Sequence, residues 1–319
     1  MLASAMPSES RLERSSMKKD RIYVYPLSIA IVIVIVSMMM TMAACNSESA
    51  DDVTATEELQ VNVGIVTRAA TTYDATTFDA GKTIGISLEQ TASNYAPFQN
   101  VAYITNGTTW GPATGAIQLR VGDTNTRGVA YYPYKANTNP AAIPITCDTE
   151  TDWMYSTWSN TVHRKSHTAA FEMHHAQTVV VIEINSSAYT DTGNLDELTI
   201  ESDAFGLSGT LNATNGTLSS VNTANITQTY TSANVRTTSF SDQFYVLTTG
   251  QETSLTVTLS LDGRTIVGTI TGIQFEQGMR YTFEVVVNNG WLAIRRVTIV
   301  PWDVTHETDK QEFIIQDPT

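Results

Sequence analysis

Few residues of this 319-residue chain are of the types that could catalyse a reaction or bind a metal, and the histidines are the first candidates. Four of the five lie close together, at His163, His167, His174 and His175. His163 and His167 have the i, i+4 spacing that would place two metal ligands on one face of a helix. The Thr- and Ser-containing segment around them looks extended or looped, however, and on a strand residues four apart lie roughly 13 Å apart. With no HExxH pattern present, we expect neither a metal site nor a cofactor.

Candidate nucleophiles are equally isolated in the sequence. Cys147 has no CxxC or papain-like sequence around it, so we expect a free, partly buried thiol. The Gly-x-Ser-x-Gly and P-loop patterns are absent, and no pair of carboxylates suggests glycoside hydrolysis. A lipid-anchored enzyme is supported only by unassigned carboxylates. We therefore expect a protein that is not an enzyme.

The second cysteine, Cys45, follows a targeting signal. Residues 27–40 (LSIAIVIVIVSMMM) form an apolar run shorter than the roughly 18–20 residues of a spanning helix. Basic residues precede this run: Lys18, Lys19 and Arg21. It leads into Met42-Ala43-Ala44-Cys45, which resembles a bacterial lipobox; the alternative is a cysteine left after a membrane helix. The resemblance implies that residues 1–44 are a lipoprotein signal peptide and that Cys45 carries the lipid, palmitate included, that holds the chain in the outer membrane.

Two further segments flank this signal: the start of the chain and the residues after Cys45. Met17 would make a natural start for the signal, so residues 1–16 are either a mis-called extension or a long basic region. Residues 45–57 are small, polar and acidic, which is typical of a flexible tether. Their acidic cluster either resembles the surface-export signals of Bacteroidota lipoproteins or is a solvated linker; it consists of Glu48, Asp51 and Asp52.

Composition restricts the classes of structure and partner. Hydrophobic residues make up 42% of the chain, which is enough for folded cores. The net charge is −14, which argues against nucleic acid as a partner because phosphates would repel the chain. The chain has 49 threonines and only 16% charged residues, a composition that favours β-structure.

Alternating apolar residues predict strands throughout the mature chain, with no sustained helical period. Alternation is clearest at 59–65, 255–261 and 281–287, and 179–184 is the apolar run of a central strand. Asp262-Gly263 predicts a tight hairpin turn. Strands of this length at this spacing suggest stacked β-sandwiches. The turn-rich stretch Asn185–Asn194 predicts the boundary between an N-terminal sandwich, residues 58–188, and a C-terminal sandwich, residues 189–319.

Seven sequence elements in order resemble the fimbrillin family of Bacteroidota, the subunits of type V pili. They are Thr67-Arg68-Ala69; residues 78–86 (FDAGKTIGI, with Lys82 in place of the usual Asp); Ala130-Tyr131-Tyr132-Pro133-Tyr134; Asp152-Trp153-Met154-Tyr155; residues 171–176 (FEMHHA); Phe244-Tyr245-Val246-Leu247; and residues 278–283 (GMRYTF) with Ile299-Val300-Pro301-Trp302. No single element is specific for this family, but the occurrence of all seven in this order over residues 59–302 is.

The resemblance implies a fold and a function. The fold would be all-β, two stacked sandwiches of transthyretin-like, Greek-key type. The precursor would reach the cell surface as a lipoprotein, and an arginine-specific protease would remove its first strand. A strand from another pilin subunit would then fill the groove, building a fimbrium that serves adhesion to a host or bacterial surface.

The chain has residues that suit these roles. The first strand would place Leu59, Val61, Val63 and Ile65 in the groove. Arg68 is the only Lys or Arg between Cys45 and Lys82, so cleavage is expected between Arg68 and Ala69; the alternative is an ordinary surface arginine.

A candidate donor strand lies near residues 310–316, with Phe313, Ile314 and Ile315 as its apolar run. The alternative is a final strand paired within its own domain. Pro301 would end the preceding strand, and Trp302 would cap the second core.

A second function stays in competition with the pilin. A surface lipoprotein that binds a glycan or a host protein without polymerising would use the same fold, but its first strand would never be removed. Within the pilin interpretation, the shaft, tip and anchor roles all stay open.

Overall fold

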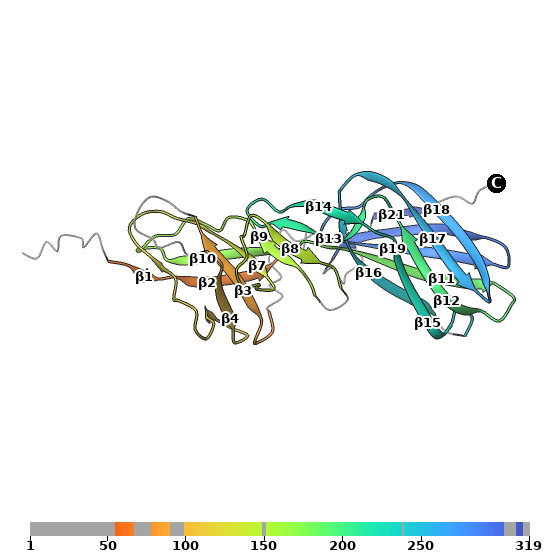
Figure 1. The fold of residues 1–319 in the computed structure, drawn as a ribbon, viewed down its shortest axis with the longest axis horizontal. Coiled ribbons are helices and arrows are strands. Elements are labelled where there is room, and N and C mark those ends of the chain that lie inside the picture. The colour runs from red at the N-terminus through yellow and green to blue at the C-terminus, as the bar shows by residue number, and fades with distance from the viewer. Residues whose placement is uncertain are drawn as a thin grey trace, which may run out of the picture. The chain divides into compact units, whose positions relative to one another are not determined.

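The computed structural model describes residues 55–66, 78–89, 99–148, 151–237, 239–302 and 311–314, and every regular element among them is a β-strand (Figure 1). The predicted all-β fold is confirmed. No long apolar helix of the kind that crosses a membrane occurs in these ranges. The expected signal peptide and Cys45 lie outside the described residues.

The first half of the fold is one seven-stranded sheet with a short ribbon. In spatial order its strands are β2 (Gln60–Ile65), β10 (Thr168–His175), β9 (Met154–Ser156), β7 (Gly128–Tyr132), β3 (Thr83–Leu88), β4 (Val101–Thr105) and β5 (Trp110–Pro112). The ribbon pairs β1 (Glu57–Glu58) with β6 (Arg120–Val121).

This sheet closes around its own core. The edge strands β2 and β5 contact each other although they are not paired, so the sheet curls and encloses apolar side chains from both ends of its strand order. The core includes Phe171 and Met173 of β10, Ile84 and Ile86 of β3, and Leu119 beside the ribbon. Tyr131 of β7 is also buried, in a separate cluster with Ile143 and Trp153.

The second half is a sandwich of two sheets. The larger sheet has the order β14 (Thr217–Thr223), β13 (Phe205–Asn212), β16 (Phe240–Thr248), β11 (Thr178–Ala188), β19 (Met279–Asn288), β20 (Leu292–Pro301) and β21 (Gln311–Ile314), and β8 (Ile143–Thr146) also pairs with β13. The smaller sheet has the order β15 (Ile226–Asn234), β12 (Asn194–Glu201), β17 (Glu252–Leu261) and β18 (Arg264–Gln274).

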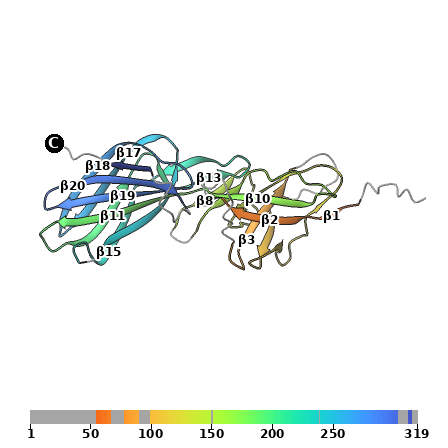
Figure 2. The ribbon, with the colours of Figure 1, turned by 180° about the vertical axis from the view of Figure 1, so that it is seen from behind.

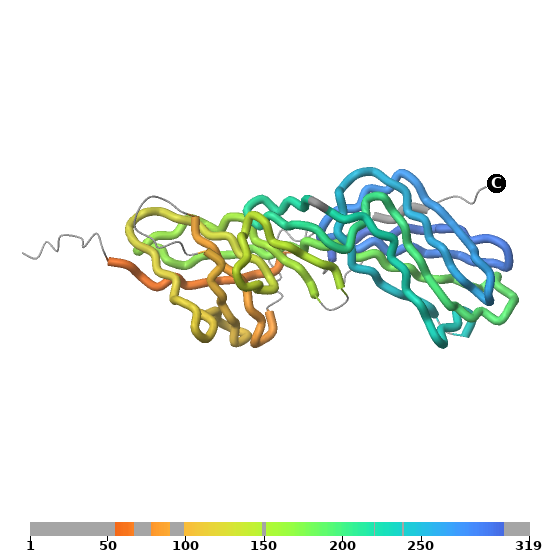
Figure 3. Tube along the Cα trace, in the orientation of Figure 1, coloured from red at the N-terminus to blue at the C-terminus, as the bar shows by residue number. Residues whose placement is uncertain are grey.

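Side chains at alternate positions of both sheets meet in one core. Leu255, Val257 and Leu259 of β17 face this core, whereas the Thr and Ser residues between them point away from it. The hairpins β17–β18 and β19–β20 can be followed in the tube of Figure 3. Asp262 and Gly263 both have positive φ, 49° and 72°, as the predicted two-residue turn requires.

Strand β11 belongs to the second sandwich. The predicted boundary near residue 188 puts it in the first, but its partners are β16 and β19, and Val180, Ile182 and Ile184 lie in the second core. The turn-rich stretch that follows β11 leads to β12 of the same sandwich. All the cores lie in one compact unit, Val53–Thr319.

Trp302 occupies a different place from the one expected. Its ring stacks on the imidazole of His175 at the end of β10, with 4.6 Å between centroids, instead of capping the second core. Pro301 is the last residue of β20 and lies opposite Met279. The next residue, Trp302, donates its N–H to the carbonyl of Gly278. The indole therefore lies beside the turn before β19.

Candidate functional site at the first strand

Strand β2 lies at the edge of the seven-stranded sheet. It pairs with β10 in parallel, from Gln60 opposite Thr168 to Ile65 opposite Met173, and the two strands run side by side in Figures 1 and 2. Among the described residues, its other edge is paired with no strand. One line of backbone hydrogen bonds therefore holds β2, which is the arrangement that a second chain could take over.

The side chains of β2, together with that of Leu59 directly before it, contact the core more extensively than the backbone contacts the rest of the sheet. Leu59 and Val61 are only 3% and 6% exposed, and Val63 and Ile65 pack partly buried against the same core. Burying an aliphatic side chain of this size contributes roughly 1.5–3 kcal/mol. All four side chains thus contact the core, and the free energy of this contact lies mainly in Leu59 and Val61.

The beginning of the strand is clamped by Arg120. The guanidinium donates to Thr56 Oγ1 over 2.9 Å and to the Thr56 carbonyl over 2.8 Å, and it pairs with Glu58 at 3.2 Å. The Leu59 N–H donates to the Leu119 carbonyl over 2.8 Å. The side chains of Arg120 and Glu58 are 43% and 67% exposed, so solvent screens this ion pair and it contributes little to stability compared with the buried apolar side chains.

The far end of β2 points toward a cavity. The Val66 N–H donates to the Met173 carbonyl over 2.8 Å, and Val66 helps line a cavity of about 210 Å³ with Tyr155, His174 and Trp302. His175 forms part of its wall, and its Nδ1 lies 2.9 Å from Asp152 Oδ1. Arg68 and Ala69, the predicted cleavage site, follow two and three residues later and lie outside the described residues.

The candidate donor strand is paired within this chain. Backbone pairing places Phe313 opposite Val297 and Ile314 opposite Arg296, so β21 extends the sheet at β20. This pairing is the one expected of a final strand that stays in its own domain. Ile315 lies outside the described residues, and whether the segment leaves this position to act as a donor stays a prediction.

A family model described as fimbrillin-like matches residues 67–302. The chain belongs to this family. A search of curated protein sequences finds no significant match. Among solved structures, the fimbrillin-like protein is similar to a putative cell adhesion protein from Bacteroides ovatus ATCC 8483 (TM-score 0.58, 16% identity, covering 79% of this chain and 100% of that one).

Two further structures share the fold of the fimbrillin-like protein. One is a putative cell adhesion protein from Bacteroides uniformis ATCC 8492 (TM-score 0.58, 17% identity, covering 77% of this chain and 99% of that one). The other is a fimbrial protein from Bacteroides vulgatus ATCC 8482 (TM-score 0.50, 14% identity, covering 76% and 99%). At these identities the likeness supports the fold.

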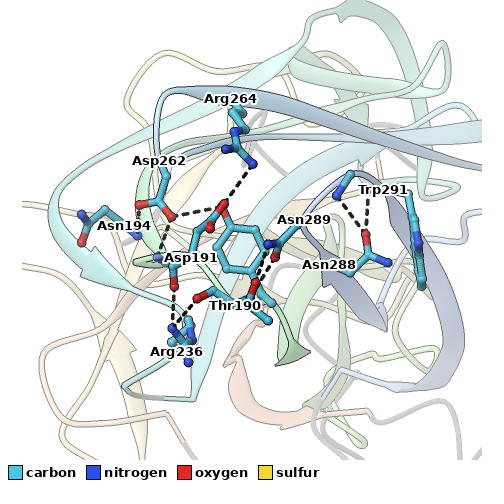
Figure 4. A network of polar contacts seen from close by, with 12 residues as sticks. Thr190, Asp191, Asn194, Arg236, Asp262, Arg264, Asn288, Asn289 and Trp291 are labelled. Atoms are coloured by element: carbon cyan, nitrogen blue, oxygen red, sulfur yellow. Dashed lines mark hydrogen bonds and ion pairs between the residues drawn. The ribbon is translucent and has the colours of Figure 1, made fainter.

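The fimbrillin-like protein also has a polar cluster that sequence reasoning missed (Figure 4). The carboxylate of Asp262, in the β17–β18 turn, accepts hydrogen bonds from the Gly193 N–H (2.7 Å), the Asn194 N–H (2.9 Å) and the Tyr189 hydroxyl (3.0 Å). Beside it, Arg264 pairs with Asp191 at 2.9 Å. The sequence signal was the Asp-Gly turn, but nothing there indicated that its carboxylate would bind a loop about 70 residues away.

Electrostatics at this cluster follow from its hydrogen bonds. Burial alone would raise the pKa of Asp262, but the donated N–H and O–H bonds and the nearby Arg264 outweigh burial and lower it. Burial, together with the hydrogen bond to Asp262, raises the pKa of Tyr189 to about 12. The tyrosine therefore stays a donor and the aspartate an acceptor across the neutral range.

In the same loop region, the β19–β20 turn carries an exposed tryptophan. The side chain of Asn288 accepts the backbone N–H groups of Gly290 and Trp291 at 3.0 and 2.9 Å. Trp291 itself is 43% exposed. A rigid turn thus presents an indole to solvent in the fimbrillin-like protein.

The histidines and Cys147 end in ordinary structural positions. His163 lies in a tight turn, where its N–H donates to Ser166, and in the described ranges no group of three His, Cys, Asp or Glu side chains could hold a metal ion. Cys147 is a free, buried thiol, and burial raises its pKa to about 11.

Proposed function

We propose that this fimbrillin-like protein is a subunit of a surface fimbrium that serves adhesion. Its activity would be assembly, not catalysis. The precursor would be exported as a lipoprotein, anchored in the outer membrane through Cys45, and cut after Arg68 by an arginine-specific protease. Other subunits would then bind by strand exchange, and the finished fimbrium would contact a host or bacterial surface.

The observation that carries the proposal is the position of β2. A strand that buries Leu59 and Val61 while pairing only with β10 in the described fold combines a strong side-chain contact with a replaceable backbone contact. Its removal would leave an apolar groove and an unpaired edge, and both favour addition of another strand. Contacts of this head-to-tail kind do not close on themselves, so they build filaments.

The test is the N-terminal sequence and intact mass of the protein recovered from filaments sheared from its own cells. The proposal expects a start at Ala69. Cells that produce Arg68→Lys provide a matched variant, because lysine keeps the positive charge but not the guanidinium that an arginine-specific protease recognises. This variant should accumulate uncut precursor in the membrane fraction and give no filaments. Filaments of normal length from Arg68→Lys cells would contradict the proposal.

A second candidate is a surface lipoprotein that keeps its first strand and binds a glycan or a host protein. The exposed Trp291 on its rigid turn favours it, because an indole face surrounded by polar loops suits sugar stacking. Retention of residues 46–68 in the native protein, together with loss of glycan binding in Trp291→Ala but not in Val267→Ala, would support this candidate. Val267 is also exposed, but it lies on β18.

A further inference from the structure

Strand β18 borders the smaller sheet of the second sandwich, and in the described fold only its edge toward β17 is paired (Figure 1). From Arg264 to Thr271 it pairs with β17 residue by residue, without a register shift. Four other border strands differ: β14 and β15 are interrupted by register shifts, and β5 and β21 are only three and four residues long. Bulges and short length keep a border strand from pairing with a further chain, and residues 264–271 have neither device.

The side chains of β18 place no barrier to pairing either. Residues 265–273 (TIVGTITGI) contain no proline and no charged residue, although the chain as a whole has 32 acidic residues and a net charge of −14. Arg264 is the only charged residue of the strand. Natural border strands are often protected by lysine or proline, so β18 lacks this protection as well.

Backbone hydrogen-bonding groups point out of the free edge of β18 at every second residue. Asp262-Gly263 form a two-residue turn, so the flanking residues Leu261 and Arg264 are a hydrogen-bonded pair. Because the pattern alternates from there, the N–H and C=O groups of the odd-numbered residues point away from β17. The four residues concerned are all exposed: Thr265, Val267, Thr269 and Thr271. The contact with β20 is made on the core side, where Leu292 packs against Gly268.

These four residues can pair with the same four of a second copy. In an antiparallel arrangement centred on Gly268, Thr265 lies opposite Thr271 of the second copy, and Val267 lies opposite Thr269. All four then exchange backbone hydrogen bonds, whereas centring the pair on Val267 engages only three. Each cross-strand pair joins threonine with threonine or with valine, so no like charges meet.

We propose that residues 265–271 of β18 pair edge to edge with the same residues of a second copy of this chain, in the antiparallel register centred on Gly268. The pairing joins two four-stranded sheets into one sheet of eight strands. It needs neither the removal of β2 nor strand exchange, so it goes beyond the proposed function.

The size of this contact sets its strength. Seven residues a side are far fewer than the roughly 20–30 of a stable interface, so a single pair is weak. Each copy is also acidic, and the repulsion between copies is screened by salt, so the pairing should strengthen as ionic strength rises. Subunits arranged in a row repeat the contact many times. In a fimbrium, the β18 edges would therefore hold neighbouring filaments side by side through avidity.

The first experiment tests the register by disulfide formation. It uses the uncut chain from Asn46, in which β2 is in place and the only native cysteine, Cys147, is buried. One preparation carries Val267→Cys, and a second, of different mass, carries Thr269→Cys. Opposed residues of a hydrogen-bonded antiparallel pair have Cα atoms about 5.5 Å apart, which suits a disulfide. In the proposed register each new cysteine lies opposite the other variant's cysteine.

Oxidation of this mixture should yield the mixed dimer in at least about tenfold excess over either homodimer. In a homodimer the two new cysteines would be diagonal neighbours with Cα atoms roughly 7–8 Å apart, beyond the usual range of a disulfide. A mixture of Thr265→Cys and Thr269→Cys is the matched control. These two residues are also diagonal neighbours in the proposed register, so this mixture should give little mixed dimer.

The second experiment removes one outward N–H group. Thr269→Pro loses this group without breaking a bond to β17, whereas Thr269→Ala keeps it. In sedimentation equilibrium at 0.5 M NaCl, the parent and Thr269→Ala should form a dimer with a dissociation constant of roughly 0.1–1 mM, and lower salt should weaken it. Thr269→Pro should weaken this dimer at least about tenfold. Val267→Lys, a change at an exposed position that lowers the net negative charge, should also weaken it.

Equal amounts of mixed dimer and homodimers would overturn the register, and association unchanged in both Thr269→Pro and Val267→Lys would overturn the β18 edge as the contact. A parent chain that stays monomeric at 1 mM in 0.5 M NaCl and forms no mixed disulfide would overturn the pairing itself. None of these results depends on cleavage at Arg68, so the proposed function is tested separately.

Discussion

Val61 of β2 lies directly opposite Ala169 of β10, and both side chains are buried in the same core. The small alanine leaves the branched side chain of Val61 to cover this part of the core. An edge strand of the sheet therefore carries part of the core of the first half, which is why its removal would change the molecule.

We expect Val61→Thr to lower the free energy of unfolding by about 1–3 kcal/mol. The substitution replaces a buried methyl group with a hydroxyl of almost equal size, for which the fold provides no hydrogen-bond partner. Urea denaturation of the chain from Asn46 measures the change. Asn62→Thr, at the neighbouring exposed position, should stay within about 0.5 kcal/mol. Equal effects at the two positions would mean that β2 is not packed as described.

Two glycines in the same sheet give a contrasting pair. A Cβ atom on Gly85 of β3 would lie 2.4 Å from Tyr131 Cε1 and 2.6 Å from Asn100 Oδ1, whereas a Cβ on Gly64 of β2 would meet nothing within 4 Å. Tyr131 cannot move easily, because its hydroxyl donates to Asn100 Oδ1 over 2.7 Å and it is buried. Gly85→Ala should therefore destabilise the protein by about 1–3 kcal/mol.

Gly64→Ala is the control for that substitution. It should be neutral or raise the free energy of unfolding by up to about 1 kcal/mol, because alanine restricts the unfolded chain. Thermal unfolding of the two variants in parallel makes the comparison. A Gly64→Ala variant as unstable as Gly85→Ala would show that β2 is more tightly enclosed than its edge position indicates.

The Asp262 cluster predicts a dependence of stability on pH. The folded pKa of Asp262 is lowered, so its contribution is present above the unfolded pKa of the carboxyl and is lost as pH falls through the folded value. Asp262→Asn should remove this acid-sensitive part, so the difference in unfolding free energy between parent and variant should shrink from pH 7 to pH 2. A constant difference over that range would contradict it.

The dependence of stability on pH that Tyr189 contributes, in the same cluster, has the opposite sign. Its folded pKa is raised to about 12, so its contribution is complete below its ordinary value of 10.0 and is lost as pH rises toward 12. The difference in unfolding free energy between the parent and Tyr189→Phe should therefore become smaller at high pH and stay constant between pH 5 and 8. Denaturation midpoints at pH 7, 10 and 11.5 measure this.

The sequence identified strands more readily than their partners. Alternation at Leu59 and Val61 predicted buried positions correctly because a period of two depends only on which face meets a core. The same logic could not tell which core receives Val180 and Ile182, because an apolar strand is compatible with either sandwich. Trp302 and Asp262 were beyond prediction for a related reason. Their partners, His175 and Gly193, are far away in the chain, and only the folded topology brings them together.

The thiol of Cys147 offers a reporter for one region of the fold. It lies in a third core with Leu211 and Trp153, apart from the core that β2 covers. With its pKa raised to about 11, about one thiol in a thousand is ionised at pH 8. In the chain from Asn46, where Cys147 is the only cysteine, native alkylation should be slower than in denaturant by several hundredfold or more.

Destabilising variants should separate in this assay according to which core they affect. Leu211→Ala removes a neighbour of Cys147 and should speed its alkylation in the native protein, because it favours local opening of that core. Val61→Thr, at similar cost in global stability, should leave the alkylation rate close to that of the parent as long as labelling is measured far from the denaturation midpoint. If Val61→Thr instead accelerates alkylation as much as Leu211→Ala, the two regions open as one cooperative unit, and loss of β2 would then loosen the whole subunit rather than its groove alone.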